Sequence, residues 1–500
     1  MPRSRRAQVW GAVSALVAVW LLIAAAPAPG APVLVIGLDG LERRVVEGMW
    51  AEGYLPHLKA LADRGVTLDL ITADRSQERP VWTTVATGRP SDEHGITKNT
   101  VPGTTTTARG AGSEERQVRA LWNVAHRYGL TSHVADWPAS YPAESIAGTI
   151  LTDRATGTAR AGVASPPKAA ASLDRWNRRA EQAFWDLFPG FRDGSAPDRL
   201  SVWSSLQALQ TGTAELIMLR LRTVDQTSHR LWKYFEPENY PSAREPGWEF
   251  EAQEFYESYV AVDAAVGRLV AALPPQGHVL ALSAHGFKGV AESTTLKCTL
   301  VPVLEHLGHL AIYGGEPEWR KTRLYVLDSP HSNPRKQVRV NLKGRERKGR
   351  VSPADRDALL QELETSLAEV QYAGTQTPAF RVEEPRPGET GDVVVVFNEI
   401  GVGTILEHGD DRIDDAMLNF RRRSGGHGRD TPGLLIAAGP AIAHGPGGFR
   451  ATVFDVAPLV LHLLGIPLSD ELRGRLLDQA LTPTWRQANP VETTGSYERR

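Results

Sequence analysis

The sequence predicts an α/β protein with a doubly wound, mostly parallel sheet and helices on both faces. Three observations support this fold class. Short apolar runs rich in β-branched residues alternate with longer segments of helical periodicity. The short runs are continuously apolar, as expected for strands that are buried on both faces. Several of them end in glycine or in a polar cluster, as strands do where they lead into a helix.

The individual elements follow from the same patterns. Strands are predicted at 33–36, 132–135, 216–219, 279–282, 392–397 and 434–438. Helices are predicted at 43–62 (broken at Gly53 and Pro56), 80–88, 118–127, 180–187, 251–273, 355–370 and 455–464. A Thr/Gly-rich stretch at 101–112 and a basic stretch at 316–349 interrupt the alternation. Both are predicted to be cap segments inserted on the substrate face.

Composition and charge limit the function classes. A chain of 500 residues with 41% hydrophobic content can bury a large core, and we assign residues 31–482 to one domain and 483–500 to a loose polar tail. Lys and Arg number 56 against 58 Asp and Glu, so the net charge of −2 predicts no nucleic-acid partner. The single cysteine, Cys298, excludes a disulfide framework within the chain and a cysteine-based zinc cluster.

The basic stretch and its edge have two interpretations. A solvated surface face is the simpler one, and attraction of anionic substrates or lipid headgroups is the alternative. The residues concerned are Arg335, Lys336, Arg339, Lys343, Arg345, Arg347, Lys348 and Arg350.

The first thirty residues are typical of a targeting segment. Three arginines among the first six residues precede an apolar run at 9–26, and a Pro/Ala/Gly stretch follows at 27–32. This order indicates a signal peptide or a signal anchor whose N-terminus stays in the cytoplasm. Cleavage after Ala26 or Ala28 would leave proline next, which favours an uncleaved anchor. The rest of the chain is therefore expected outside the cytoplasm, periplasmic or secreted, and held at the membrane by 9–26.

Polar residues that can bind metal follow several of the predicted strands. Asp39 ends the first strand, and His285 follows the strand at 279–282. Asp225 and His229 follow the strand at 216–219, and their spacing of four places them on one face of a helical turn. His427 lies in a Gly-rich loop before the strand at 434–438. Because ligands gather at the carboxyl ends of parallel strands, these side chains are expected near one another.

The order of these features resembles the alkaline phosphatase superfamily, in particular bacterial relatives of type I phosphodiesterase/nucleotide pyrophosphatase. The resemblance covers nearly everything from residue 33 to about residue 481. The motifs that carry it are GLDG at 37–40, PVWTTVATG at 80–88, HGI at 94–96, Asp225 with His229 and Trp232, HGF at 285–287, NLKGRE at 341–346, His427, DVAP at 455–458 and LLG at 463–465.

The resemblance implies a two-metal site that hydrolyses phosphate esters or diesters. Asp225, His229 and His427 would hold one ion, and Asp39, His285 and the residue at 284 would hold the other. Zinc is expected, because two imidazoles and one carboxylate suit it. In the family, a Thr or Ser just before the Pro-x-Trp helix attacks phosphorus. Asn99 is a candidate donor to a phosphoryl oxygen, or else a structural loop residue.

Two positions depart from the family pattern. Glu78 stands where the nucleophile belongs, and Ala284 stands where relatives have a metal-binding aspartate. Glu78 could replace the missing ligand and give a second metal set of Asp39, Glu78 and His285. Attack would then come directly from water, or from Ser76 after a local loop shift. Thr83 and Thr84 are poorer nucleophile candidates, because they match family residues inside the helix.

Three functions are consistent with these features. The first is a metal-dependent phosphodiesterase or phosphohydrolase. The second is a catalytically impaired relative that binds a phosphorylated or glycan ligand, with Arg79 or the arginines at 421–423 supplying charge in place of metal. The third is an envelope scaffold whose cleft is plugged by the inserted segments. Other catalytic signatures, such as Gly-x-Ser-x-Gly and the phosphate-binding P-loop, are absent from the sequence.

Overall fold

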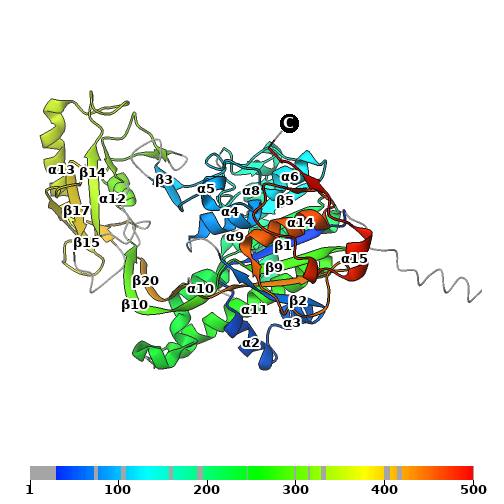
Figure 1. Cartoon of the computed structure of the whole chain (residues 1–500). Coiled ribbons are helices and arrows are strands. Elements are labelled where there is room, and N and C mark those ends of the chain that lie inside the picture. Colours follow the sequence, from blue (N-terminus) through cyan, green and yellow to red (C-terminus); the bar gives the residue numbers. More distant parts are fainter. Residues whose placement is uncertain are drawn as a thin grey trace, which may run out of the picture.

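In a computed structural model of the protein, a ten-stranded sheet lies at the centre of the main body of the chain (Figure 1). The structure describes residues 30–72, 77–102, 108–156, 161–187, 195–244, 246–297, 300–313, 316–327, 334–398, 406–413, 419–428 and 430–498. The strand order is β22-β2-β21-β9-β1-β8-β5-β6-β7, and β23 also pairs with β2. The fold class predicted from the sequence is confirmed.

The middle of this sheet is parallel. Its five parallel strands are β9 (His278–Ser283), β1 (Val33–Leu38), β8 (Leu216–Leu221), β5 (Ser132–Ala135) and β6 (Gly148–Leu151). All residues of β1, β8, β9 and β5 are buried, as their apolar sequences predict. The carboxyl ends of these strands therefore meet along one edge of the sheet.

Antiparallel strands extend the sheet beyond β9 and β6. The strand β21 (Gly433–Ala438) runs antiparallel to β9 and to β2 (Gly65–Ile71). Because β21 runs in the opposite direction, the segment that leads into it lies at the same edge as the carboxyl end of β9. The short strands β22 (Gly445–Pro446), β23 (Ala451–Thr452) and β7 (Ala164–Ser165) complete the sheet.

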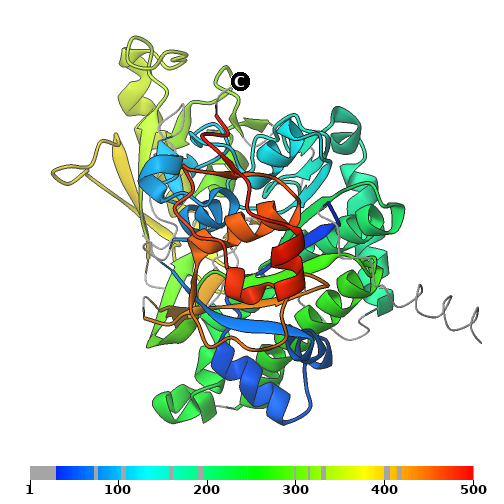
Figure 2. The same ribbon diagram turned by 45° about the vertical axis from the view of Figure 1, so that its right-hand side comes forward.

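Helices cover both faces of the sheet, and alternate residues of β1 belong to two different cores. Val33 and Val35 pack on the face covered by α4 (Glu78–Thr87), α6 (Leu121–Arg127) and α14 (Val456–Leu463). Leu34 and Ile36 pack on the opposite face. That face is covered by α2 (Arg43–Ala51), α3 (Pro56–Asp63), α9 (Ala196–Thr211), α10 (Thr223–Leu231) and α11 (Trp248–Ala272). Figure 2 shows α14 lying across the front of the sheet.

A second packed unit lies within the residues from 300 to 413 and is joined to the body by a two-stranded ribbon (Figure 1). The ribbon pairs β10 (Phe287–Lys297) with β20 (Asn419–His427). The unit contains an antiparallel sheet of β13 (Leu324–Val326), β14 (Arg335–Val340), β17 (Val393–Phe397) and β16 (Phe380–Glu383), with α12 (Val301–His306) and α13 (Arg356–Ala368). The strand predicted at 392–397 thus forms in this smaller sheet, which has its own hydrophobic core.

The inserted stretches differ in what they form. The described part of 101–112 belongs to a small hairpin of β3 (Thr100–Pro102) and β4 (Ala108–Gly110). The basic stretch contributes β14, and three of its arginines, Arg335, Arg339 and Arg345, face carboxylates. Arg335 pairs with Glu383 and Glu389, and Arg345 lies 2.6 Å from Asp392. These ion pairs favour the structural interpretation of the basic stretch over attraction of an external anion.

The C-terminal segment corrects one expectation, because residues 483–498 are ordered against the body. The helix α15 (Pro483–Ala488) buries Trp485 completely, and Tyr497 is also buried. The strand β25 (Thr493–Thr494) pairs with β24 (Leu468–Ser469). Two aromatic side chains in a polar segment are enough to hold it, because each buries a large apolar area.

Residues 1–29, which make up nearly all of the predicted targeting segment, lie outside the described residues, as do Ser76 and Cys298. Within the part of the chain that the structure describes, no helix is both long enough and apolar enough to cross a membrane.

Candidate functional site

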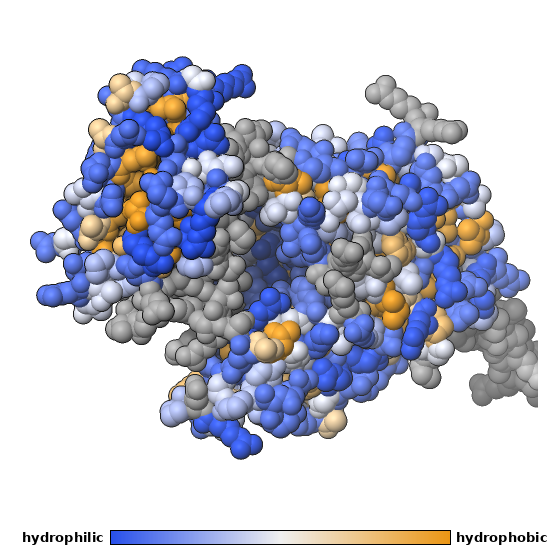
Figure 3. Space-filling model, turned by 60° about the vertical axis from the view of Figure 1, so that its left-hand side comes forward, coloured by the Kyte–Doolittle hydropathy of each residue, from blue (hydrophilic) through white to orange (hydrophobic). Residues whose placement is uncertain are grey.

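A polar cleft of about 410 Å³ lies at the edge where the parallel strands end. Its lining residues are Asp39, Glu78, Asn99, Arg220, Arg222, Asp225, Gln226, His229, Arg423 and His427. A hydrophilic hollow is visible beside the inserted unit in Figure 3. Of the eight site residues predicted from the sequence, six line the cleft, His285 lies against Asp39, and Ser76 lies outside the described residues.

Asp225, His229 and His427 converge on one side of the cleft, and we refer to them as the Asp225 cluster. His427 Nε2 lies 2.8 Å from Asp225 Oδ1, and His229 Nε2 lies 3.6 Å from the same oxygen. One ligand atom from each residue lies within 4.8 Å of the others. All three side chains are between 16% and 26% exposed, so they are accessible from the cleft. This donor set fits a divalent cation.

The ring of His229 is oriented for this role. Its Nδ1–H donates a hydrogen bond to the carbonyl of Gly425 at 3.0 Å, which leaves Nε2 directed towards Asp225. Burial lowers the pKa of His229, and the carboxylate of Asp225 only partly opposes this. The neutral imidazole is the form that ligates metals.

The elements that carry the Asp225 cluster are held by buried contacts. Asp198, on α9, accepts hydrogen bonds from the backbone N–H groups of Arg222 and Thr223 and so anchors the start of α10. At Gly425 a Cβ atom would lie 2.3 Å from the carbonyl oxygen of Ser228. The missing side chain lets β20 approach α10 closely, and His427 thereby reaches Asp225.

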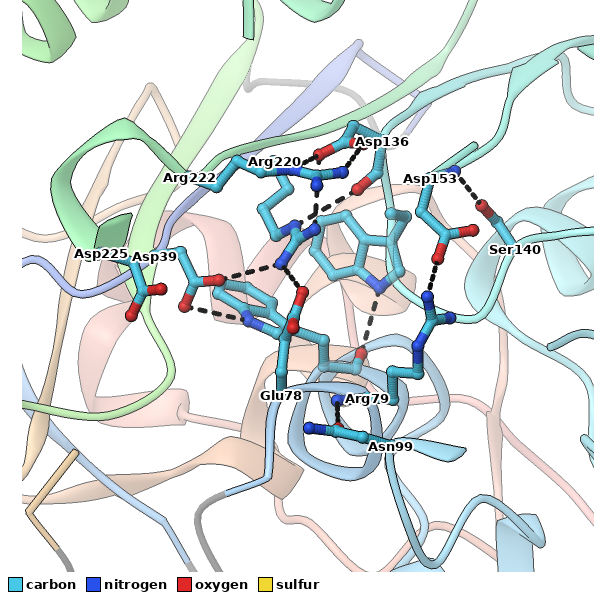
Figure 4. A network of polar contacts seen from close by, with 12 residues as sticks. Asp39, Glu78, Arg79, Asn99, Asp136, Ser140, Asp153, Arg220, Arg222 and Asp225 are labelled. Atoms are coloured by element: carbon cyan, nitrogen blue, oxygen red, sulfur yellow. Dashed lines mark hydrogen bonds and ion pairs between the residues drawn. The ribbon is translucent and has the colours of Figure 1, made fainter. Parts of the chain in front are cut away.

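The opposite side of the cleft is built around an arginine, and we call it the Arg220 cluster: Asp39, Glu78, Asp136, Arg220 and Arg222 (Figure 4). Arg220 Nη1 lies 2.9 Å from Asp39 Oδ2 and also pairs with Glu78. Its Nη2 lies 3.4 Å from Asp136 Oδ2. Arg220 and Asp39 are each only 2% exposed, whereas Glu78 is 39% exposed. One buried guanidinium therefore pairs with carboxylates from three different segments.

These contacts change the ionisation of the buried members. Burial alone would raise the pKa of Asp39, but its contacts with His285 and Arg220 outweigh burial and hold that pKa well below its usual range. The three carboxylates raise the pKa of Arg220 well above its ordinary value despite burial. Asp39 is therefore a carboxylate, and Arg220 a cation, throughout the physiological range.

Asp136 and Arg222 extend the ion-pair network beyond Arg220. Arg222 Nε donates to Asp136 Oδ2 at 2.7 Å, and Arg222 also contacts the other carboxylate oxygen. Asp136 follows β5 with a φ of 55°, a backbone conformation that is uncommon outside glycine. Such conformations persist where the surroundings enforce them, and they concentrate at functional sites.

Asp39 has two further neighbours. The indole N–H of Trp82 donates to Asp39 Oδ1 at 3.3 Å, and His285 Nε2 lies 3.2 Å from the same oxygen. A second group of close ligand atoms contains Asp39, Asp225 and His285. It shares Asp225 with the first group, and its Asp39 is already paired with Arg220. A second ion would thus share Asp225 with the first and lie beside a buried cation.

The predicted second set of Asp39, Glu78 and His285 is not assembled. No group of three close ligand atoms among the described residues includes Glu78. The carboxylate of Glu78 pairs instead with the buried guanidinium of Arg220. Ala284 contributes a fully buried methyl group to the hydrophobic core, so no carboxylate enters from that position.

The remaining candidates divide between the cleft and the fold. Asn99 lines the cleft, and its Oδ1 accepts the backbone N–H of Arg79 at 2.9 Å, so its amide NH₂ is the group left to bind a ligand. Arg79 itself pairs with Asp153 at 2.6 Å and does not line the cleft, contrary to the alternative raised from the sequence. Thr83 and Thr84 hydrogen-bond inside α4 and are buried.

Sequence reasoning missed three members of the Arg220 cluster: Arg220, Arg222 and Asp136. A signal was present, since Arg220 interrupts an otherwise apolar strand, LIMLRL. A charged residue in a strand that is buried on both faces requires a partner of opposite charge.

Comparison with known proteins identifies the family. The sequence model of type I phosphodiesterase/nucleotide pyrophosphatase matches residues 33–418. The chain belongs to the type I phosphodiesterase/nucleotide pyrophosphatase family. No curated protein sequence matches the chain.

Solved structures of ectonucleotide pyrophosphatase/phosphodiesterase 5 are similar to this member of the phosphodiesterase family. The murine protein is 15% identical with a TM-score of 0.44, and its inactive variant in complex with AMP is 15% identical with a TM-score of 0.43. The human protein is 14% identical with a TM-score of 0.42. Each match covers 90% of this chain and 100% of the other.

The type I phosphodiesterase/nucleotide pyrophosphatase family is metal-dependent, and this member has two candidate groups of ligands. The Asp225 cluster is one of them, and the other contains Asp39, which is already paired with Arg220. The Arg220 cluster and Ala284 occupy the region where the resemblance places a second ion. The two halves of the cleft therefore differ in kind.

Proposed function

We propose that this protein is a metal-dependent hydrolase of phosphate esters or diesters that acts outside the cytoplasm. The observation that carries the proposal is the Asp225 cluster, three metal-type ligands gathered in an open polar cleft. Family membership supports phosphodiester chemistry. Zinc is the proposed ion, because two imidazoles and one carboxylate match its preferences.

The side chains of the cleft have separable roles in this proposal. Asp225, His229 and His427 would hold a divalent cation, and such an ion would supply Lewis-acid stabilisation of the phosphoryl group and lower the pKa of water. Arg222 and Arg423 line the cleft and attract the anionic substrate. The amide NH₂ of Asn99 donates to a phosphoryl oxygen. Glu78 is held by Arg220 and is a carboxylate acceptor rather than a nucleophile towards phosphorus.

Turnover of a chromogenic diester tests the proposal directly. Full-length protein, purified in mild detergent, is assayed with bis(p-nitrophenyl) phosphate and with p-nitrophenyl phosphate, before and after chelation and with zinc restored. Metal-dependent hydrolysis that is lost in Asp225→Ala and kept in Arg230→Ala supports the proposal. Arg230 is a matched control because it lies on the same helix and pairs with Glu254, away from the cleft lining. A metal-loaded protein that turns over neither substrate contradicts it.

A second candidate function is binding of a phosphorylated ligand without hydrolysis. It is favoured by one observation, the pairing of Glu78 with Arg220 at the position of the family nucleophile. The double variant Glu78→Thr plus Ala284→Asp separates the two functions. If the natural protein binds phosphate but is inert, and the double variant turns over, the protein is a binder derived from an enzyme. Turnover by the natural protein excludes this reading.

Attachment to the membrane through residues 9–26 is part of the proposal. It rests on the basic flank and the apolar run. Protease treatment of intact and of permeabilised spheroplasts tests it. Digestion of the domain in intact spheroplasts supports an extracytoplasmic location, and digestion only after permeabilisation contradicts it.

A further inference from the structure

The strand β8 carries one charged side chain among five apolar ones. Every residue of this strand is buried, and Arg220 is 1% exposed as a whole residue. A guanidinium keeps its proton under all physiological conditions, so its positive charge is a fixed feature of the fold. Burial of such a charge is tolerated only when it is paired and hydrogen-bonded.

The partners of Arg220 come from three separate segments. Asp39 ends β1, Glu78 begins α4, and Asp136 follows β5. The three carboxylates surround one guanidinium, as Figure 4 shows. Arg222 shares Asp136 from the other side, so that carboxylate joins two guanidinium groups. The arrangement is a closed ion-pair network between the strand ends and the start of α4.

The same region offers a second divalent ion a weaker set of ligands, because its candidate group of Asp39, Asp225 and His285 shares Asp225 with the first site and contains a carboxylate paired with Arg220. Ala284 offers a methyl group where a carboxylate is expected, and its backbone carbonyl accepts a hydrogen bond from the hydroxyl of Thr72. Glu78, the only replacement carboxylate the sequence suggested, pairs with Arg220. Asp39 retains His285 as a neighbour, but one of its oxygens lies 2.9 Å from the guanidinium. An ion there would have to displace or face a positive charge.

We propose that the cleft binds one metal ion per chain, at the Asp225 cluster, and that Arg220 supplies the positive charge that a second ion would supply beside Asp39 and Glu78. The inference rests on the proposed metal site and goes beyond it by assigning the ion count and the residue that replaces an ion. The cleft then contains two kinds of cation: an exchangeable metal ion at the Asp225 cluster and the guanidinium of Arg220, which is part of the chain.

The first test is a count of metal ions in the natural protein. Full-length protein, purified in detergent and stripped of metal, is titrated with Co²⁺ and with Zn²⁺, and bound metal is measured by mass spectrometry. We expect one equivalent, loss of that equivalent in Asp225→Asn, and retention of one equivalent in Asp39→Asn. Two equivalents in the natural protein, or the loss of an ion in Asp39→Asn, would overturn the inference.

The second test removes the arginine and restores the missing carboxylate. Arg220→Gln plus Ala284→Asp should raise the count from one to two, whereas Arg230→Gln plus Ala284→Asp should stay at one. A folded double variant of Arg220 that still binds one ion contradicts the inference, as does a second ion in Ala284→Asp alone. If the Arg220 variant does not fold, the counts in the natural protein and in Asp39→Asn decide the question.

Metal counts and turnover are independent readouts of the same preparations. An inert protein that binds one ion contradicts the proposed hydrolysis and agrees with this inference. An active protein that binds two ions does the reverse.

Discussion

The two halves of the cleft solve the same electrostatic problem in different ways. In the Asp225 cluster, one carboxylate and two imidazoles lie open to the cleft and offer ligand atoms to an external cation. In the Arg220 cluster, the carboxylates are paired with a guanidinium that belongs to the chain. The proposed cation of the Asp225 cluster is a free metal ion, so it can be removed and exchanged. The positive charge of the Arg220 cluster is fixed, because the guanidinium belongs to a side chain of the buried strand β8.

This difference teaches that loss of a metal ligand need not mean decay of a site. Ala284 removes a carboxylate, and Glu78 returns one, but the returned carboxylate binds an arginine. The carboxylates of the second half are therefore paired with guanidinium groups rather than with a metal, at the cost of the open coordination positions that a metal offers to a substrate.

The largest effect should come from removal of the fixed cation. Arg220→Ala leaves Asp39 buried without its guanidinium partner and removes one of the two guanidinium groups that contact Asp136, and breaking a buried pair in this way costs about 3–5 kcal/mol. Urea unfolding at pH 7 measures the loss. The matched control is Arg230→Ala, whose side chain is 39% exposed and pairs with Glu254, so a loss of about 1 kcal/mol or less is expected. Equal losses in the two variants would show that Arg220 does not hold the second half together.

The next largest effect concerns metal binding at the Asp225 cluster. Zinc at about 100 times its dissociation constant should stabilise the protein by about 2.7 kcal/mol, because only the folded chain presents the Asp225 cluster. The measurement is the melting temperature of the stripped protein with and without zinc. Asp225→Asn should abolish the increase, and Asp39→Asn should retain it. An increase that is lost in Asp39→Asn would move the ion to the other half of the cleft.

A third prediction concerns Asp392, which pairs with two arginines in the inserted unit and does not line the cleft. Its effect on stability can be compared with that of the arginine–carboxylate pairs in the Arg220 cluster. Contacts with Arg345 and Arg356 outweigh burial and lower the pKa of Asp392 to about 2. Because the folded pKa lies below the unfolded value of about 3.9, this stabilisation is present above pH 4 and is lost as the pH falls through about 2.

Asp392→Asn should therefore cost about 2 kcal/mol at pH 7, and progressively less as the pH falls from 4 towards 2. Urea unfolding of both proteins at pH 7, 4 and 3 measures the difference. A difference that does not depend on pH would mean that Asp392 acts through packing rather than charge.

The smallest effect should come from the rim of the cleft. Arg423 lines the cleft and makes a hydrogen bond from Nε to the carbonyl of Gly425 at 3.0 Å. Arg423→Gln should raise the KM for a chromogenic diester about 5-fold, which corresponds to about 1 kcal/mol, and leave the metal content unchanged. A fall in metal content would show that Arg423 supports the Asp225 cluster and not the substrate.

Much of the fold was predictable because the signals are local. The continuously apolar runs at 33–36, 216–219 and 279–282 all form strands of the central sheet, since such runs are stable only when both faces are covered. The inserted unit was harder, because the strand at 393–397 has the same apolar pattern but pairs antiparallel with β14 and β16. Pairing partners depend on contacts between distant segments, which a local pattern does not contain.

The sequence by itself determined the residue types of the Asp225 cluster, because their spacing and their positions beside strands are enough to predict a shared edge. It also determined that the second half is altered, through Glu78 and Ala284. Only the tertiary structure decided how that half is neutralised. The partners of Arg220 are separated from it by up to 181 residues in the chain, and only the packing of β1, β5, β8 and α4 brings them together around one guanidinium.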